Sequence, residues 1–292
     1  MDWSAERSYG LMKKIGSKDP LWVKILIHAL LITACLVTIY PILRIVTISL
    51  RPGDRLMSTS LAIIPSDATF ANYKEALVEK DFLLWIWNSL VITLTTAFIG
   101  LTLASTSAYA ISRWKFPGRN AMLIFLLGTQ MIPAAMLMVP LYLLAAKFGM
   151  INTYRGLVIA YSVSAVPFSI WILKGYYDSI PVTLEEAAMI DGASRMYTFW
   201  KIILPLTTPA LAIAFLFNFM NSWNEFMLAR IMLPKSGMFT WPLGLQSLQG
   251  QFVTEWGVYA ASSIMISIPV VALFLYSSKW LVNGLTAGSV KG

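Results

Sequence analysis

The sequence predicts an all-α integral membrane protein, and its composition and hydropathy pattern carry that prediction. Hydrophobic residues make up 58% of the 292 residues and charged residues only 12%, against roughly 25% charged residues in soluble domains. Six uncharged apolar runs are long enough, or nearly so, to cross about 30 Å of hydrocarbon as helices. None of these runs alternates polar and apolar residues with a period of two, which argues against an outer-membrane barrel.

The six runs predict six membrane-spanning helices. They cover residues 25–43, 82–112, 121–146, 156–173, 202–224 and 257–278. A polar N-terminal segment, residues 1–24, and a short C-terminal tail, residues 283–292, flank a transmembrane domain that covers residues 25–282. Between the first two runs, turn-forming residues precede residues 70–77, whose pattern predicts a short amphipathic helix at the membrane surface.

The distribution of Lys and Arg predicts that both termini lie in the cytoplasm. Positive charge is denser on the side of the N-terminus, and two groups carry the excess: Arg7, Lys13, Lys14, Lys18 and Lys24 before the first run, and Arg113, Lys115 and Arg119 after the second. Such residues mark cytoplasmic flanks of membrane helices. An even number of spans also places residues 177–207, between the fourth and fifth runs, in the cytoplasm. The net charge of +8 therefore indicates membrane topology rather than nucleic-acid binding.

Residues 177–207 begin with a predicted short helix. Thr183 can cap it, and Glu186, three residues later, completes a capping box. The acidic residues of this stretch lie early in the helix, where its dipole favours negative charge. Ala187 and Ala188 give a smooth packing face, and Gly192 can end the helix with a positive φ.

A second helix is predicted to begin near Ala193 and to end at Ile203, because Pro205 and Pro209 follow. The result is a pair of short helices with a bend between them, a shape that fits a socket on a partner. By composition alone, the same residues are equally typical of an ordinary amphipathic loop between two membrane helices.

The spacing of residues in this stretch resembles the Glu-Ala-Ala loop of the permease subunits of bacterial ABC importers. The resemblance rests on Glu186-Ala187-Ala188, Gly192, Ile202 and Leu204-Pro205. Residues 70–77, 87–119 and 280–292 are also similar to these permeases, within the carbohydrate-uptake branch and the shorter permease of a maltose-type pair. The resemblance implies that the following residues couple the chain to an ATPase: Glu186, Ala187, Ala188, Asp191, Gly192, Leu204 and Pro205.

The resemblance also implies the partners and the location of the chain. We expect a second, homologous permease subunit, two ABC ATPase subunits that bind ATP and Mg²⁺, and an extracytoplasmic sugar-binding protein. No cofactor and no nucleic acid are expected on this chain. The complex would lie in the bacterial cytoplasmic (inner) membrane and translocate a sugar or oligosaccharide.

The residue inventory argues against catalysis on this chain. With one His and one Cys, the sequence offers neither a catalytic triad nor a zinc site, and it has no phosphate-binding loop of the Gly-x-x-x-x-Gly-Lys type. The alternative functions are an ion-coupled secondary transporter and, less favoured, an intramembrane enzyme. Secondary transporters usually carry charges within the membrane. The spans here are nearly free of charge, which favours an energy source on another polypeptide.

A polar group at the end of the fifth run suggests a substrate path. Asn218, Asn221, Asn224 and Glu225 share a predicted helix face by three- and four-residue spacing, and Tyr161 lies in the fourth run. Amides and carboxylates can bind sugar hydroxyls. Equally, polar groups in a membrane bind neighbouring helices or emerge at the headgroups.

Two further features concern helix breaks. Prolines inside the runs predict kinks, which serve either as hinges or as simple adjustments of shape: Pro41, Pro133, Pro140, Pro167 and Pro269. Asn283, Gly284 and Gly288 are predicted to end the last helix. The tail beyond would then contact the ATPases or fray.

Overall fold

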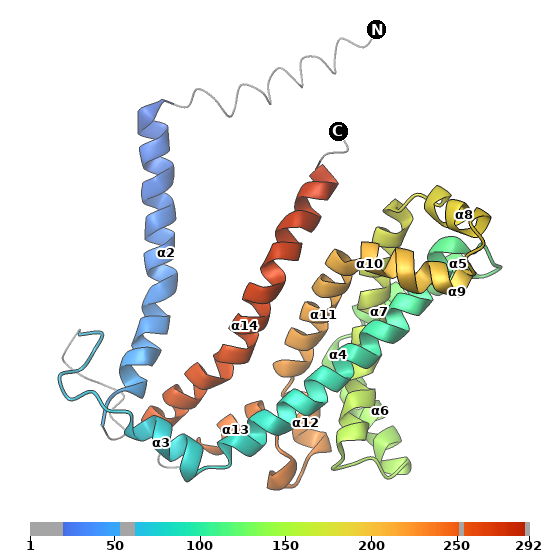
Figure 1. Ribbon diagram of the computed structural model, residues 1–292. Coiled ribbons are helices and arrows are strands. Elements are labelled where there is room, and N and C mark those ends of the chain that lie inside the picture. Colours follow the sequence, from blue (N-terminus) through green and yellow to red (C-terminus); the bar gives the residue numbers. More distant parts are fainter. Residues whose placement is uncertain (1–19, 53–61, 251–253, 290–292) are drawn as a thin grey trace.

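The structure is a computed structural model that describes residues 20–52, 62–250 and 254–289 (Figure 1). Within these ranges every named element is a helix, which agrees with the predicted all-α fold. Four helices are long and apolar enough to cross a membrane: α2 (Leu21–Ser49), α4 (Phe82–Arg113), α7 (Tyr154–Ser179) and α14 (Trp256–Ser289). Each contains, or nearly contains, one of the predicted runs. The short helix α3 (Ala71–Val78) confirms that residues 70–77 form a short helix.

The other two predicted spans are bent pairs of helices. Helices α5 (Arg119–Met131) and α6 (Ala134–Lys147) meet at 100°, and residues 195–206 meet α11 (Thr208–Trp223) at 75°. The described part of the chain therefore holds four straight candidate spans, or up to six if each bent pair counts as one.

The prediction of one continuous helix over residues 121–146 is wrong. Ile132 is extended, as a residue before proline prefers, and Pro133 stands at the N-cap of α6. The remaining prolines of this kind lie inside helices that continue past them: Pro41, Pro140, Pro167 and Pro269. Only one of the five predicted kinks becomes a full break.

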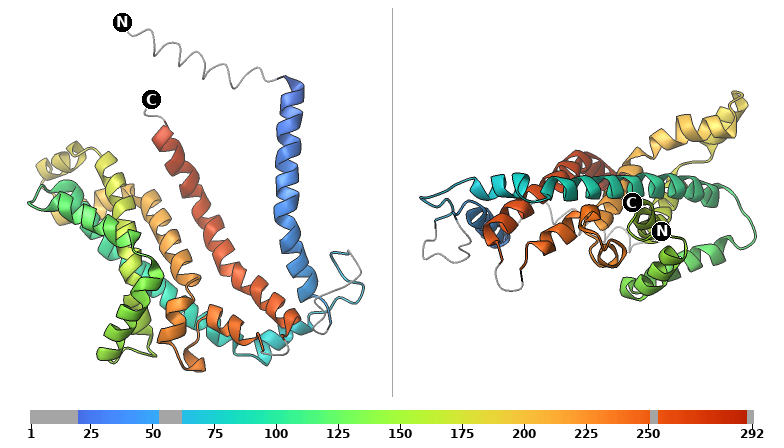
Figure 2. Two further views of the ribbon diagram at one scale, coloured as in Figure 1. Left: turned by 180° about the vertical axis from the view of Figure 1, so that it is seen from behind. Right: turned by 90° about the horizontal axis from the view of Figure 1, so that it is seen from below.

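The core of the molecule forms where α4 packs along α7 and α11. Small residues line these contacts, including Ala104 and Ala108 of α4 and Ala210 and Ala214 of α11. Small side chains let membrane helices approach closely and pack by dispersion. Helix α2, by contrast, contacts α14 and stands apart from the α4–α7–α11 core in both Figure 1 and Figure 2.

The bundle has two distinct ends. The first, here called the loop end, carries α8 (Thr183–Ile190), the start of α2 and the end of α14 (Figure 1). The opposite end carries α3, α12 (Met227–Met232) and α13 (Trp241–Ser247). The two ends of the transmembrane domain thus lie together with the loop, as the even number of predicted spans requires.

The predicted end of the last helix is wrong. Helix α14 runs through Asn283, Gly284 and Gly288 to Ser289, so most of the predicted tail, residues 283–292, continues the helix, and its last three residues lie outside the described chain. A glycine inside a helix costs only about 1 kcal/mol relative to alanine. A helix of 34 residues can absorb that cost.

Candidate functional site

The loop between α7 and α11 begins with helix α8, and its start differs from the prediction. The N-cap is Val182, and no side-chain hydrogen bond caps the helix. Val182 already has helical backbone angles, and Leu184 N–H donates to the Pro181 carbonyl. The first turn therefore forms one step early, Thr183 lies inside the helix, and the predicted capping box with Glu186 is absent.

The predicted bend at Gly192 is present. Gly192 has a φ of +87°, and its N–H donates to Met189 O while Ala193 N–H donates to Ala188 O. These two bonds form a Schellman motif, which closes a helix through a left-handed residue. A Cβ atom added at Gly192 would meet nothing within 4 Å. The backbone angle, rather than crowding within this chain, is what requires glycine here.

The second short helix is longer than predicted. It consists of α9 (Arg195–Thr198), the π-helix η1 (Phe199–Ile203) and α10 (Leu204–Leu206), and the Ser194 side chain caps it by accepting from Tyr197 N–H. Pro205 does not end the helix as expected. The wider π turn before it, with Leu204 N–H bound to Phe199 O, relieves the clash that a proline ring makes with the preceding turn.

Four of the seven residues predicted to couple to an ATPase are exposed on α8 or directly after it. Glu186, Ala187, Asp191 and Gly192 are exposed, and large apolar side chains lie beside them, with Ile190 at 86% exposure and Met196 at 67%. We call this surface the loop face. Ala188 is buried, Leu204 is partly buried against the core and Pro205 is exposed. The loop face thus combines apolar area with two carboxylates.

Sequence reasoning missed the role of Glu185, which points the other way from Glu186. The Glu185 side chain is buried; it pairs with Arg113 Nε at 2.5 Å and accepts from the Tyr109 hydroxyl at 2.6 Å. Arg113 also donates to the carbonyls of Tyr177 at 2.9 Å and Ile180 at 3.2 Å. The available signal was the spacing of Glu185 and Ala188, which puts both on the inner face of one helix.

The residues predicted to line a substrate path do not share one face. Asn218 is fully buried and exchanges hydrogen bonds with Ser169 of α7, at 2.8 and 3.1 Å. Asn221 and Asn224 are exposed, and the Asn224 amide donates to the Met220 carbonyl of its own helix. Asn218 therefore binds a neighbouring helix, which is the alternative to a substrate contact.

Glu225 lies beyond the end of α11 and joins three segments. Its carboxylate accepts from the Tyr161 hydroxyl at 2.8 Å and from the N–H groups of Leu228 and Ala229 at 2.8 and 3.1 Å. It therefore caps α12 from within the chain and satisfies the buried Tyr161. Because α11 ends at Trp223, the predicted continuous face that includes Glu225 does not form.

One cavity brings a residue predicted to contact the substrate together with side chains of the types that bind sugars. It has a volume of about 430 Å³ and lies between α11, α13 and α14. Asn224 lines it together with Trp223, Trp241, Ser263 and Ser267. Sequence reasoning missed Ser263 and Ser267. Their four-residue spacing inside an apolar helix was the available signal, because it places both hydroxyls on one helix face.

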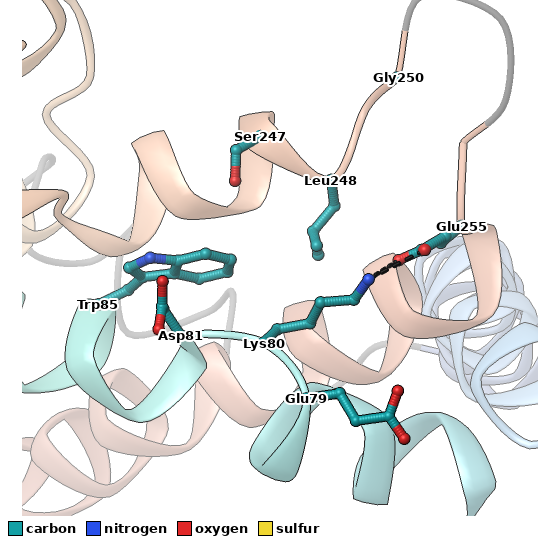
Figure 3. Close-up of a pocket in the computed structure, with 8 residues that line it drawn as sticks. All are labelled: Glu79, Lys80, Asp81, Trp85, Ser247, Leu248, Gly250 and Glu255. Carbon is teal, nitrogen blue, oxygen red and sulfur yellow. Dashed lines mark hydrogen bonds and ion pairs between the residues drawn. The ribbon is translucent and has the colours of Figure 1, made fainter. Parts of the chain in front are cut away.

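A second pocket, of about 380 Å³, lies at the opposite end of the bundle (Figure 3). Figure 3 shows Lys80 reaching from the α3–α4 connection to Glu255, at 2.7 Å between Nζ and the nearer carboxylate oxygen. The hydrogen bond to Glu255 raises the pKa of Lys80. Glu79 and Asp81 also line this pocket, so it is acidic overall.

Comparison with known proteins gives consistent matches. Residues 97–285 match the family described as binding-protein-dependent transport system inner membrane component. The chain is 33% identical to the maltose/maltodextrin transport system permease protein MalG of Photorhabdus laumondii, over 96% of this chain and 100% of that protein. It is 38% identical to the galactooligosaccharides transport system permease protein GanQ of Bacillus subtilis, over 91% and 94%.

The fold also matches solved structures. One chain of a bacterial ABC transporter involved in the import of the acidic polysaccharide alginate superposes with a TM-score of 0.78 at 24% identity, covering 90% of this chain and 99% of that one. A chain of the alginate transporter in complex with an alginate pentasaccharide-bound periplasmic protein matches with a TM-score of 0.64 at 16% identity, covering 89% and 96%.

Proposed function

This chain belongs to the family of binding-protein-dependent transport system inner membrane components, and from that premise we propose that it is a membrane-spanning permease subunit of an ATP-driven sugar importer. It is a multi-pass protein of a bacterial inner membrane. The family match over residues 97–285 carries the proposal. Relatives named for maltodextrins and for galactooligosaccharides support a sugar or oligosaccharide as the substrate.

We propose that the loop face docks on an ATPase subunit. The Schellman bend at Gly192 holds two short helices at a fixed angle, and the exposed apolar side chains beside Glu186 and Asp191 suit a socket with basic groups at its rim. ATP and Mg²⁺ would be bound by two such partner subunits. The loop end, with the start of α2 and the end of α14, would then face the cytoplasm.

We further propose that α2 lies against a second permease subunit and that a binding protein docks at the opposite end. No residue in the apolar stretch of α2 is buried within this chain, so its sides are available to another protein. The similar alginate ABC transporter is in complex with an alginate pentasaccharide-bound periplasmic protein, which supports a periplasmic binding protein as a delivery partner.

The cavity beside Asn224 is our candidate for the part of the sugar path on this chain. Indole rings can stack on the apolar face of a sugar, and amide and hydroxyl groups can bind its hydroxyls. Its volume of about 430 Å³ falls in the usual range of small-molecule sites. Asn224 is the proposed contact residue inside the cavity, and the exposed Asn221, which does not line it, stays a proposed contact on the path outside. Asn218, Tyr161 and Glu225 would support them through their bonds to neighbouring helices.

The deciding experiment is reconstitution of the complex. The chain would be co-expressed with its neighbouring permease, ATPase and binding-protein genes, purified together, and assayed in proteoliposomes with maltotriose and a galactooligosaccharide. We expect uptake that needs ATP and the binding protein and that a protonophore leaves unchanged. Uptake driven by an ion gradient without ATP would instead establish the secondary-transporter alternative.

A further inference from the structure

We propose that Glu185, Arg113 and Tyr109 form a buried anchor that makes helix α8 move as one body with α4, so that Glu185 is a positioning residue for energy coupling. This inference rests on the proposed function, because it concerns how motion at the loop face reaches the membrane helices. It assigns the inward face of α8 a role separate from the docking role of the outward face.

Helix α8 needs such an anchor. It has eight residues, and a helix this short is not stable in isolation. Two of its residues are buried, Glu185 and Ala188. Of these, Glu185 alone has hydrogen-bonding groups in its side chain, and both of its carboxylate oxygens bind residues of α4.

Arg113 extends the connection from α8 to a second membrane helix. It is the last residue of α4, and its two terminal nitrogens bind the carbonyls of Tyr177 and Ile180 at the end of α7. These carbonyls belong to a helix terminus, where backbone acceptors are incompletely satisfied within the helix; the Tyr177 carbonyl also accepts from the Ile180 N–H. One planar guanidinium thus joins α8, α4 and α7, a geometry that the single ammonium of a lysine cannot reproduce.

The anchor is largely shielded from solvent. It also contacts the second helix of the loop. The side chains of Arg113 and Glu185 are only 8% and 10% exposed. The Tyr109 ring packs on Phe199 of η1, with centroids 4.7 Å apart. A buried charge pair resists separation because either group alone would be left unpaired in a poorly solvated site. A push on the loop face is therefore passed to α4 rather than absorbed by bending of the loop.

A second ion pair at the same end provides a matched control. Lys174 Nζ lies 2.5 Å from Asp178 Oδ2, but the two residues are one turn apart on α7, and their side chains are 18% and 39% exposed. Ion pairs within one helix and in contact with solvent contribute little. Lys174→Gln breaks an ion pair without detaching α8 from α4.

The test compares Glu185→Gln with Lys174→Gln in the reconstituted complex. Glu185→Gln keeps the size of the side chain and removes its charge. We expect this complex to assemble and hydrolyse ATP, while sugar transported per ATP hydrolysed falls at least about fivefold, the lower end of typical coupling between linked sites. Lys174→Gln should keep the wild-type ratio.

A distance measurement separates anchoring from a general effect on folding. Spin labels would be attached in a Cys35→Ser background at Leu103→Cys on α4 and Leu184→Cys on α8, two exposed positions. Double electron–electron resonance should give a narrow distribution of distances between the two labels with and without ATP. Glu185→Gln should broaden this distribution.

Two results would overturn the inference: an unchanged ratio of transport to hydrolysis, or an unchanged distance distribution. If Glu185→Gln fails to assemble, Tyr109→Phe carries the test, since it keeps the ion pair and removes one hydrogen bond. It should then lower the ratio to a smaller extent, and a wild-type ratio would reject the anchor. Absence of ATP-driven uptake by the wild-type complex would count against the proposed function instead.

Discussion

Helices α2 and α7 are both long, apolar membrane-spanning candidates, yet their surroundings are opposite. In the most apolar stretch of α7, 56% of the residues are buried within this chain, and in α2 none is. Hydropathy reports only that a helix prefers hydrocarbon to water. Whether lipid, this chain or another subunit covers the helix depends on shape and on small and polar residues, which the comparison of α2 with α7 makes visible.

The same comparison shows where α2 is attached. Only its last turn is packed: Thr47 and Ser49 are fully buried, and the Asn72 amide of α3 donates to the carbonyls of Ser49 and Arg51 at 2.9 and 2.8 Å. Helix α7, in contrast, is packed from Gly156 near its start to Tyr177 near its end. Helix α7 is therefore packed along its whole length, whereas α2 is attached at its C-terminal end.

The largest effect is expected at the start of α7, where packing leaves no room for a side chain on Gly156. A Cβ atom on Gly156 would lie 2.2 Å from the Met150 carbonyl oxygen, so Gly156→Ala must displace backbone and should destabilise the subunit by about 1–3 kcal/mol or more. Gly175→Ala, in the same helix, meets nothing within 4 Å and should stabilise by up to about 1 kcal/mol. Thermal unfolding of the two purified variants measures both, and equal shifts would show that α7 is not tightly packed at Gly156.

The next largest effect is expected at the C-terminal end of α2. Asn72→Ala removes the donor to two carbonyls and leaves them buried without that partner, at a cost of about 1–3 kcal/mol. Lys74→Ala, on the exposed side of the same helix, serves as the control and should be near neutral. Thermal unfolding of the purified variants reports the result, because loss of the attachment should lower the unfolding temperature of Asn72→Ala below that of Lys74→Ala. Equal unfolding temperatures of the two variants would mean that α2 has another attachment.

A smaller effect is expected between α7 and α11. Asn218→Ala removes both hydrogen bonds with Ser169, and interhelical polar contacts in membranes contribute about 0.6–1.7 kcal/mol. Asn224→Ala, on the same helix, loses only a bond to its own backbone and should leave stability nearly unchanged. In transport the order should reverse, because Asn224 lines the candidate sugar cavity. A transport defect of Asn218→Ala per assembled complex, at normal stability, would place Asn218 back on the substrate path.

These contrasts explain what the sequence could predict. The apolar stretches within α2, α4, α7 and α14 follow from composition, because insertion into lipid depends on residue type over about 20 positions. The C-terminal end of α14 does not. The break at Pro133, beside prolines that leave their helices continuous, depends on which neighbours satisfy the freed carbonyls, and these are known only from the fold.

The candidate sites divide in the same way. The Gly192 bend was predictable, because a left-handed residue after a short helix is a local feature. The capping box at Thr183 failed because the first turn began earlier, on Pro181. Glu185 was missed because its partner Arg113 is distant in the sequence, at the far end of α4. A feature set by neighbouring residues, such as the Gly192 bend, could be predicted from the sequence. A contact between helices distant in the sequence, such as Glu185 with Arg113, could not.

The smallest effect on this chain alone is expected in the middle of α2, and it decides what covers the helix. Leu36 is 64% exposed, so Leu36→Ala should change the stability of the isolated subunit by no more than about 0.5 kcal/mol, as for surface sites in general. If a second permease packs against α2, the same variant should reduce co-purification of that subunit, since a leucine in a packed interface contributes through dispersion and shape. Co-purification at the wild-type level, together with unchanged stability, would mean that lipid covers Leu36. The contrast between α2 and α7 would then be one between a lipid-covered and a protein-covered helix, and the second permease would have to bind elsewhere on this chain.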